Sequence, residues 1–183
     1  MDIYKLKLTQ LQLEIFRLLC VKTNQLNQRE IANFLKVSPT AINKSLKLLE
    51  KENLIKINKS KTMNLKLINL NRDSTKTIEL KRIENLKLLY ETNLLDFLEE
   101  TFPGTTILLF GSYSKGEDTI KSDIDIAIIN SKEKTINLEK FEKLLERNIN
   151  LHFYNSFKEI NKELKENLFS GILLVGAIEL WDP

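Results

Sequence analysis

The sequence predicts an α/β (α+β) protein with two domains, a small one over residues 1–72 and a second over residues 73–183. Three observations support this prediction. Apolar residues recur at helical spacing through the first fifty residues and then alternate, as in short strands. Two apolar segments typical of buried strands follow after residue 105. The charge also divides, because residues 1–70 carry a net +8 whereas residues 71–183 carry a net −5.

The composition is that of a soluble globular protein. The chain has 183 residues, of which 42% are hydrophobic and 29% charged, which is enough for one ordinary domain or two small ones. The single cysteine, Cys20, excludes an intramolecular disulfide and fits a reducing compartment. The first residues have no signal-peptide pattern, and the apolar run at 172–180 is too short to span a bilayer. We therefore expect a cytoplasmic protein without a membrane partner.

The sequence pattern of the first third of the chain predicts three helices. Residues 9–23 carry apolar side chains at helical spacing. Asn27 is suited to cap a second helix, because Glu30 follows three residues later as in a capping box. Ser38 and Pro39 suit the start of a third helix, since serine caps and proline is tolerated in the first turn.

Residues 54–58 and 63–68 alternate apolar and polar side chains, which predicts two strands around a basic hairpin tip. Two short helices joined by a tight turn and followed by such a hairpin resemble the winged helix-turn-helix domain of many bacterial and archaeal transcription regulators. The resemblance implies that the later helix enters the major groove of DNA and that the wing meets phosphates. The residues placed to do so are Thr40, Asn43, Lys44 and Lys47 on the helix and Lys59 and Lys61 on the wing.

A winged helix can also serve as a protein-interaction or dimerisation module. The net charge of +8 over residues 1–70 favours a nucleic acid partner, because a basic domain attracts a polyanion. The alternative explanation of that charge is a chance excess in a lysine-rich chain. The sequence does not determine which bases are read.

The sequence pattern of the second domain predicts a small sheet with helices packed against it. Residues 73–101 form a connecting helix and a first helix, with an interruption near Thr92 and Asn93. The later predicted segments are a strand at 106–110, a strand at 122–129, a helix around 138–145, a strand at 148–154, a helix at 157–169 and a strand within 172–181.

Two carboxylates stand at alternate positions of the second apolar strand. Side chains alternate along a strand, so Asp123 and Asp125 project to the same side, with their Cα atoms about 6.5–7 Å apart. Such a pair is repulsive unless a cation lies between the two groups. Mg²⁺ commonly takes one or two carboxylates together with substrate phosphates. Gly111 and Ser112, which end the first strand, can supply close backbone approach and a hydroxyl to a phosphate. The alternative is a strand-turn-strand with an acidic pair of no function.

Gly111-Ser112, a ten-residue interval and Asp123-Ile124-Asp125 in an apolar strand resemble the signature of the DNA polymerase beta-like nucleotidyltransferase superfamily, most closely its minimal branch. The resemblance implies that Gly111 and Ser112 bind the phosphates of ATP or another NTP. It implies that Asp123 and Asp125 hold Mg²⁺ in a two-metal site and act in catalysis. The expected reaction joins a nucleoside monophosphate, with AMP favoured, to an acceptor hydroxyl. Minimal relatives often pair with a helical HEPN-type partner, in some cases as toxin and antitoxin, and a homodimer is also open.

The chain departs from this pattern at one position. Members of the superfamily carry a third acidic residue on the strand after the following helix, and the matching residue here is Asn150. An amide can coordinate a cation through its oxygen but brings no charge and cannot act as a general base. His152, the only histidine, shares that face and could replace the base, since its reference pKa lies near neutrality. Alternatively, His152 only forms a hydrogen bond near the sheet edge.

Two functions therefore stay open. The first is an Mg²⁺-dependent nucleotidyltransferase with a DNA-binding N-terminal domain. The second is a DNA-binding regulator or antitoxin whose second domain is a catalytically degenerate nucleotide sensor or scaffold. Acceptor, preferred nucleotide and oligomeric state are outside what the sequence determines.

Overall fold

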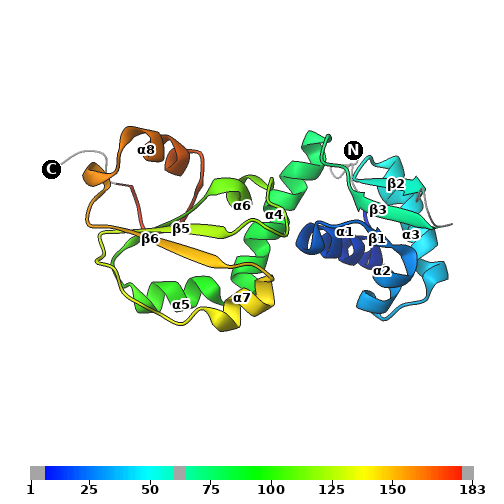
Figure 1. Cartoon of the computed structure of the whole chain (residues 1–183), viewed down its shortest axis with the longest axis horizontal. Coiled ribbons are helices and arrows are strands. Elements are labelled where there is room, and N and C mark those ends of the chain that lie inside the picture. The colour runs from blue at the N-terminus through cyan, green and yellow to red at the C-terminus, as the bar shows by residue number, and fades with distance from the viewer. Residues whose placement is uncertain (1–6, 60–64, 179–183) are drawn as a thin grey trace. The chain divides into compact units, whose positions relative to one another are not determined.

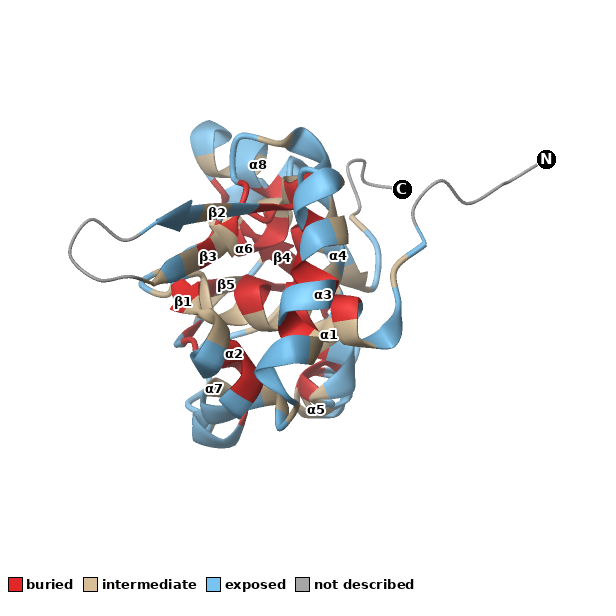
Figure 2. Cartoon of the chain, turned by 90° about the vertical axis from the view of Figure 1, so that its right-hand side faces the viewer, coloured by how far each residue is buried: buried red, intermediate tan, exposed pale blue. Residues whose placement is uncertain are grey.

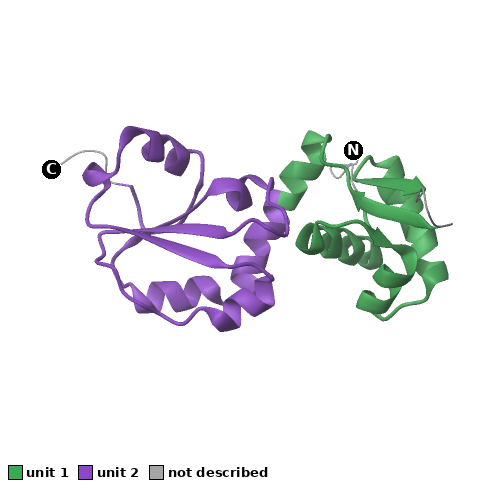
Figure 3. Cartoon of the chain, in the orientation of Figure 1, with its two compact units in different colours: residues 1–81 green, residues 82–183 purple. Residues whose placement is uncertain are grey.

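The computed structural model describes residues 7–59 and 65–178 of the chain. It divides into two compact units, Met1–Lys81 and Arg82–Pro183, shown separately coloured in Figure 3. The division falls inside helix α4 (Thr75–Glu91), a few residues beyond the boundary expected from the sequence. Lys61 and part of the expected second wing strand lie outside the described residues.

The first unit contains the three expected helices, and the second and third have the expected caps. Helix α1 (Gln10–Lys22) is capped by Thr9, and α2 (Gln28–Leu35) begins with a capping box between Asn27 and Glu30. Helix α3 (Pro39–Lys51) starts at the Ser38 cap with proline in its first turn. These local bonds occupy backbone N–H groups that would otherwise have no partner at a helix start.

A small antiparallel sheet completes the first unit, in the order β1-β3-β2. Strands β2 (Ile55–Lys59) and β3 (Lys66–Leu70) form the expected hairpin, with Ile57 opposite Ile68. The two-residue strand β1 (Leu26–Asn27) adds to β3 and has no periodic signal of its own. Apolar side chains from all three helices and the hairpin share one core.

The second unit contains a four-stranded sheet with helices on both faces (Figure 1). Its elements after α4 are α5 (Leu94–Thr101), β4 (Thr106–Phe110), α6 (Gly111–Lys115), β5 (Ile124–Ile129), α7 (Glu139–Leu145), β6 (Ile149–Tyr154), the 3₁₀ turn η1 (Phe157–Glu159), α8 (Lys162–Phe169) and β7 (Ile172–Val175). The strand order is β6-β5-β4-β7, with β5 and β6 parallel and the other pairs antiparallel.

Each face of this sheet packs against different helices. Ile124, Ile126 and Ile128 of β5 belong to a core with residues of α4, α5 and α7. Ala127 and Ile129 point to the opposite face, where Leu168 of α8 packs. The alternation therefore places Asp125 on the α8 face of the sheet.

The prediction of a single helix over residues 157–169 is wrong. The structure divides it into η1 and α8, because Ile160 between them has extended backbone (φ −73°, ψ 129°) and a side chain only 3% exposed. Asn161 then caps α8 through its side chain. The side chain of Ile160 is buried in the core between the sheet and α8, and the helix is therefore interrupted at this residue.

The expected interruption between α4 and α5 is confirmed, since Asn93 adopts a left-handed conformation there (φ 60°). Across the described part of the chain, no helix combines the length and apolar character needed to cross a membrane.

Candidate active site

The candidate site lies where β4 ends and β5 begins. In the sheet register Phe110 is opposite Asp125, and Asp125 is in turn opposite Asn150 of β6. Gly111, the first residue of α6, directly follows Phe110, so the glycine comes just after β4, whereas the carboxylate is on β5 and the amide on β6. The register therefore puts Asn150 directly beside Asp125.

Gly111 is in direct proximity to the Asp125 carboxylate. A Cβ at this glycine would lie 2.8 Å from Oδ2 of Asp125, closer than real Cβ contacts. The backbone of Gly111 also has φ +74°, a conformation that L side chains rarely adopt. Ser114 closes the turn by donating its hydroxyl to the Gly111 carbonyl at 2.8 Å. The left-handed backbone therefore favours glycine here, and a Cβ would in addition make the Asp125 carboxylate shift.

Asp123 precedes the first residue of β5 and is held by two amides. Asn148 Nδ2 donates to Asp123 Oδ1 at 3.2 Å, and Asn150 Nδ2 donates to Oδ2 at 3.1 Å. Each carboxylate oxygen thus receives a neutral donor from the neighbouring strand segment. The sequence reasoning did not assign Asn148 a role, although its place two residues before Asn150 on the same face was a usable signal.

His152 contacts the second carboxylate. Its Nε2 lies 3.2 Å from Asp125 Oδ1, and its ring meets Phe110 edge-on with centroids 5.1 Å apart. The two side chains are partly open, at 39% exposed for the histidine and 29% for the aspartate. This arrangement leaves His152 reachable by a ligand while the Phe110 ring limits its rotation.

The donor set suits one hard cation better than two. Asp123 and Asp125 offer carboxylate oxygens on one face, and Mg²⁺ favours such ligands together with phosphates. Among the described residues, no group of three or more His, Cys, Asp or Glu side chains is arranged to hold a metal. The residues present therefore fit a cation that also binds the phosphates of a nucleotide, and the residue beside Asp125 on β6 is the amide Asn150.

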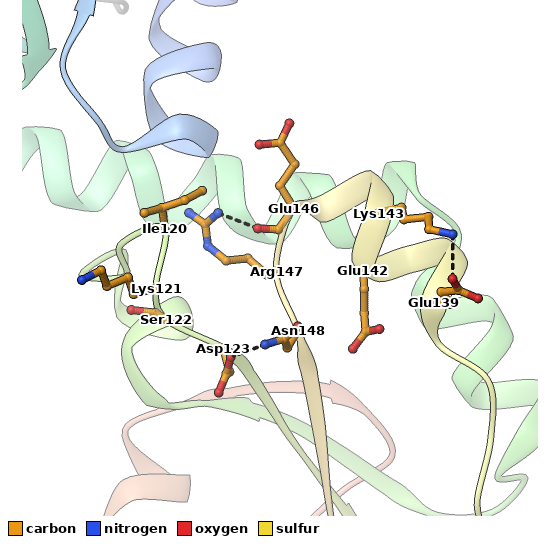
Figure 4. A pocket seen from close by; sticks show the side chains of 10 residues that line it. All are labelled: Ile120, Lys121, Ser122, Asp123, Glu139, Glu142, Lys143, Glu146, Arg147 and Asn148. Atoms are coloured by element: carbon orange, nitrogen blue, oxygen red, sulfur yellow. Dashed lines mark hydrogen bonds and ion pairs between the residues drawn. The ribbon is translucent and has the colours of Figure 1, made fainter.

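A pocket of about 420 Å³ borders Asp123 and is shown in Figure 4. One wall is the 120–123 loop and the other is helix α7 with the residues that lead into β6. On α7, Lys143 pairs with Glu139 at 2.7 Å, and Glu142 accepts from the Ile149 N–H at 2.9 Å. The pocket is thus open, polar and continuous with one carboxylate of the candidate site.

The residues expected to meet DNA lie in the first unit. Thr40, Asn43, Lys44 and Lys47 are all exposed along α3, whose outer side is pale blue in Figure 2. The opposite side of this helix buries Ile42, Leu46 and Leu49. Lys59 is exposed at the end of β2. The described candidates therefore share exposed positions on the helix and wing, as the pattern predicted.

Comparison with family models adds two findings. Residues 91–174 match the model described as a nucleotidyltransferase domain, and residues 8–56 match the model described as winged helix-turn-helix DNA-binding. The chain joins a winged helix-turn-helix domain to a nucleotidyltransferase domain. The matched nucleotidyltransferase segment contains both aspartates, Gly111 and the β6 face that contacts them. A comparison with curated proteins found no match.

Among solved structures, the chain is similar to zinc-responsive MarR-family ZitR from Lactococcus lactis, at 25% identity over 57% of this chain and 69% of that chain, with a TM-score of 0.42. A ZitR structure in complex with DNA matches at 25% identity over 56% and 67% of the two chains, TM-score 0.41. The adhesin competence repressor AdcR from Streptococcus pyogenes matches at 20% identity over 56% and 72%, TM-score 0.44.

Proposed function

We propose that this protein is a cytoplasmic nucleotidyltransferase that transfers a nucleoside monophosphate, AMP in the first instance, from an NTP to a hydroxyl of a macromolecule. The observation that carries the proposal is the approach of Gly111 to Asp125, with Asp123 hydrogen-bonded to Asn150, the residue opposite Asp125. A glycine with a left-handed backbone that lies against a carboxylate is expected where a phosphate and a cation must meet backbone.

In the proposed site, Gly111 and Ser112 bind the triphosphate, and Asp123 and Asp125 hold Mg²⁺. The cation would offset negative charge on the phosphates when bound. His152, oriented by its contact with Asp125, accepts the proton of the attacking hydroxyl. The acceptor oxygen forms a bond to the α-phosphorus, the bond from that phosphorus to the bridging oxygen breaks, and pyrophosphate leaves.

The winged helix-turn-helix domain is proposed to bind DNA through α3 and the wing. Exposed Lys44 and Lys47 would lie along the groove, and Lys59 and Lys61 would meet phosphates. A HEPN-type helical protein is the partner we propose as acceptor, in an arrangement of the toxin–antitoxin kind, and a homodimer would present two such DNA-binding helices.

One observation favours a second function. Asn150 donates its amide hydrogen to Asp123 where a third carboxylate would complete a two-metal site. A domain with this substitution could retain a nucleotide without transferring it, so the chain would act as a DNA-binding regulator that senses nucleotide. The proximity of His152 to Asp125 supports transfer instead, because a base is still present beside the acidic pair.

The deciding experiment incubates the full-length protein, alone and with the product of a neighbouring gene, with α-labelled ATP and Mg²⁺. We expect covalently retained label on protein or nucleic acid, lost in Asp123→Asn/Asp125→Asn and strongly reduced in His152→Gln. Asp96→Asn, an equivalent change at an exposed position of α5, serves as the control and should leave labelling unchanged. Absence of label from every acceptor, together with salt-sensitive DNA binding, would establish the regulator instead.

A further inference from the structure

A buried ion pair lies in the two segments that lead into the candidate site. Arg147 Nη2 is 3.3 Å from Asp118 Oδ2, and the two side chains are 1% and 0% exposed. Asp118 belongs to the loop that ends at Asp123, and Arg147 directly precedes Asn148. The pair therefore connects the two segments whose side chains meet in the hydrogen bond from Asn148 to Asp123.

Further hydrogen bonds extend this pair to two helices. Asn85 of α4, itself 2% exposed, donates Nδ2 to Asp118 Oδ1 at 2.7 Å and to the Tyr113 carbonyl of α6 at 2.9 Å. Arg147 also donates Nη1 to the Glu146 carbonyl at 2.9 Å. Both carboxylate oxygens of Asp118 therefore accept a side-chain donor, one from Arg147 just before β6 and one from Asn85 of α4.

A charged pair in this place has a cost that an apolar pair would avoid. Removing both charges from water is unfavourable, and apolar side chains of similar volume commonly give equal or greater stability. Unlike an apolar pair, a charged and hydrogen-bonded pair fixes both the separation and the relative orientation of the two segments that it joins. The loop before Asp123 has no regular secondary structure, and its local bonds include a turn between Thr119 and Ser122. Where the loop enters β5, the Ile124 N–H donates to the Asn148 carbonyl at 2.8 Å, and the ion pair adds a side-chain constraint to this backbone bond.

We propose that Asp118 and Arg147 are positioning residues, whose ion pair sets the separation between the 116–123 loop and the start of β6 and thereby holds Asp123 against Asn148. This inference rests on the proposed function, since it assigns the pair to the same nucleotidyl-transfer site. Neither residue reaches the reacting atoms. Arg147 acts through Asn148, which follows it directly, and Asp118 acts through the loop that ends at Asp123. The sequence carries no periodic or motif signal for this pairing, which joins positions on either side of β5 and α7.

The test compares the double variant Asp118→Asn/Arg147→Met with the wild-type full-length protein. Removing both charges together leaves no uncompensated buried charge, so the fold is expected to persist. The matched control is Glu91→Gln/Lys87→Met, which removes an exposed ion pair of α4 from residues outside the pocket. The direct readout is the side-chain amide resonance of Asn148 by NMR, assigned through its disappearance in Asn148→Ala.

We expect the Asn148 resonances of the double variant to move to values of a solvent-exposed asparagine, with faster hydrogen exchange, and those of the control to stay in place. In the labelled-ATP assay, kcat should fall by about 100-fold, as a displaced reacting group would cause, with a smaller change in KM for ATP. A folded double variant with unmoved Asn148 resonances and kcat within the range of the control would overturn the proposal.

The two proposals fail in different ways. Absence of transfer in the wild-type protein would refute the proposed function, while the NMR comparison would still decide whether the pair positions Asn148. Should the double variant not fold, Asn85→Leu removes a donor to Asp118 without altering any charge. The same resonances must move in that variant, by a smaller amount, and unmoved resonances there would equally reject the positioning role.

Discussion

Restoring a carboxylate at Asn150 is the perturbation that most directly tests the candidate metal site. Asn150 is exposed on β6, is opposite Asp125 in the sheet and donates to Asp123 at 3.1 Å. Asn150→Asp keeps the size of the side chain while replacing this donor with a third negative group. Without a cation we expect the variant to be less stable than the wild type.

The magnitude follows from the geometry. Two unit charges about 4 Å apart repel by about 1 kcal/mol in a water-like environment, which suits an exposed position. Loss of the hydrogen bond to Asp123 adds about 1 kcal/mol. A total of about 2 kcal/mol lowers the Tm of a chain of this length by about 4–8 °C. Binding of Mg²⁺ at about 100 times its Kd raises the free energy of unfolding by about 2.7 kcal/mol, which exceeds the destabilisation caused by the substitution.

Differential scanning calorimetry of the full-length protein, in EDTA and in excess Mg²⁺, measures both effects. The matched control is Asn155→Asp, because Asn155 also donates its amide to a carboxylate, that of Glu159, at 3.2 Å. This control should lose stability in EDTA and recover little with Mg²⁺, since it lies outside the acidic pair. Equal recovery of both variants, or none in Asn150→Asp, would refute the reasoning that this face of the sheet holds a cation.

Two further changes probe the nucleotide-binding glycine and the DNA-binding helix. Gly111→Ala should lower the free energy of unfolding by more than the about 1–2 kcal/mol that a left-handed backbone costs a non-glycine residue, and it should weaken ATP–Mg²⁺ binding measured by titration. The control is Gly104→Ala, which has the same φ of +74° and no atom within 4 Å of the new Cβ, so its loss measures the backbone contribution alone. Equal losses of stability in the two variants would contradict the proposed contact. Lys44→Ala/Lys47→Ala should weaken binding to a mixed-sequence DNA duplex and reduce its salt dependence by about 1 in log–log slope for each lysine, measured by fluorescence anisotropy. Lys132→Ala, at an exposed position of the second unit, should leave that slope unchanged, and an equal reduction would mean that α3 is not the contact surface.

Much of the fold was predictable because its signals are local. The capping box of Asn27 and Glu30 and the Ser38 cap depend on side chains within three residues of the backbone they satisfy. The alternation around Asp123 and Asp125 predicted that Ile124, Ile126 and Ile128 lie on the face opposite the carboxylates, and the structure confirms this. Local rules failed at Ile160, where packing against the sheet ends a helix that periodicity alone would continue.

The candidate site was predictable in its acidic half and not in its supporting half. Glycine, serine and the two aspartates form a spaced pattern along one segment, so the sequence by itself determined them as candidates. The family resemblance also indicated Asn150 as the residue at the position of a third acidic side chain. Only the tertiary structure placed Asn148 against Asp123 and joined Asp118 to Arg147. These contacts arise from the parallel pairing of β5 with β6 across α7, and a pairing between distant segments is set by packing of the whole domain rather than by the spacing of neighbouring residues.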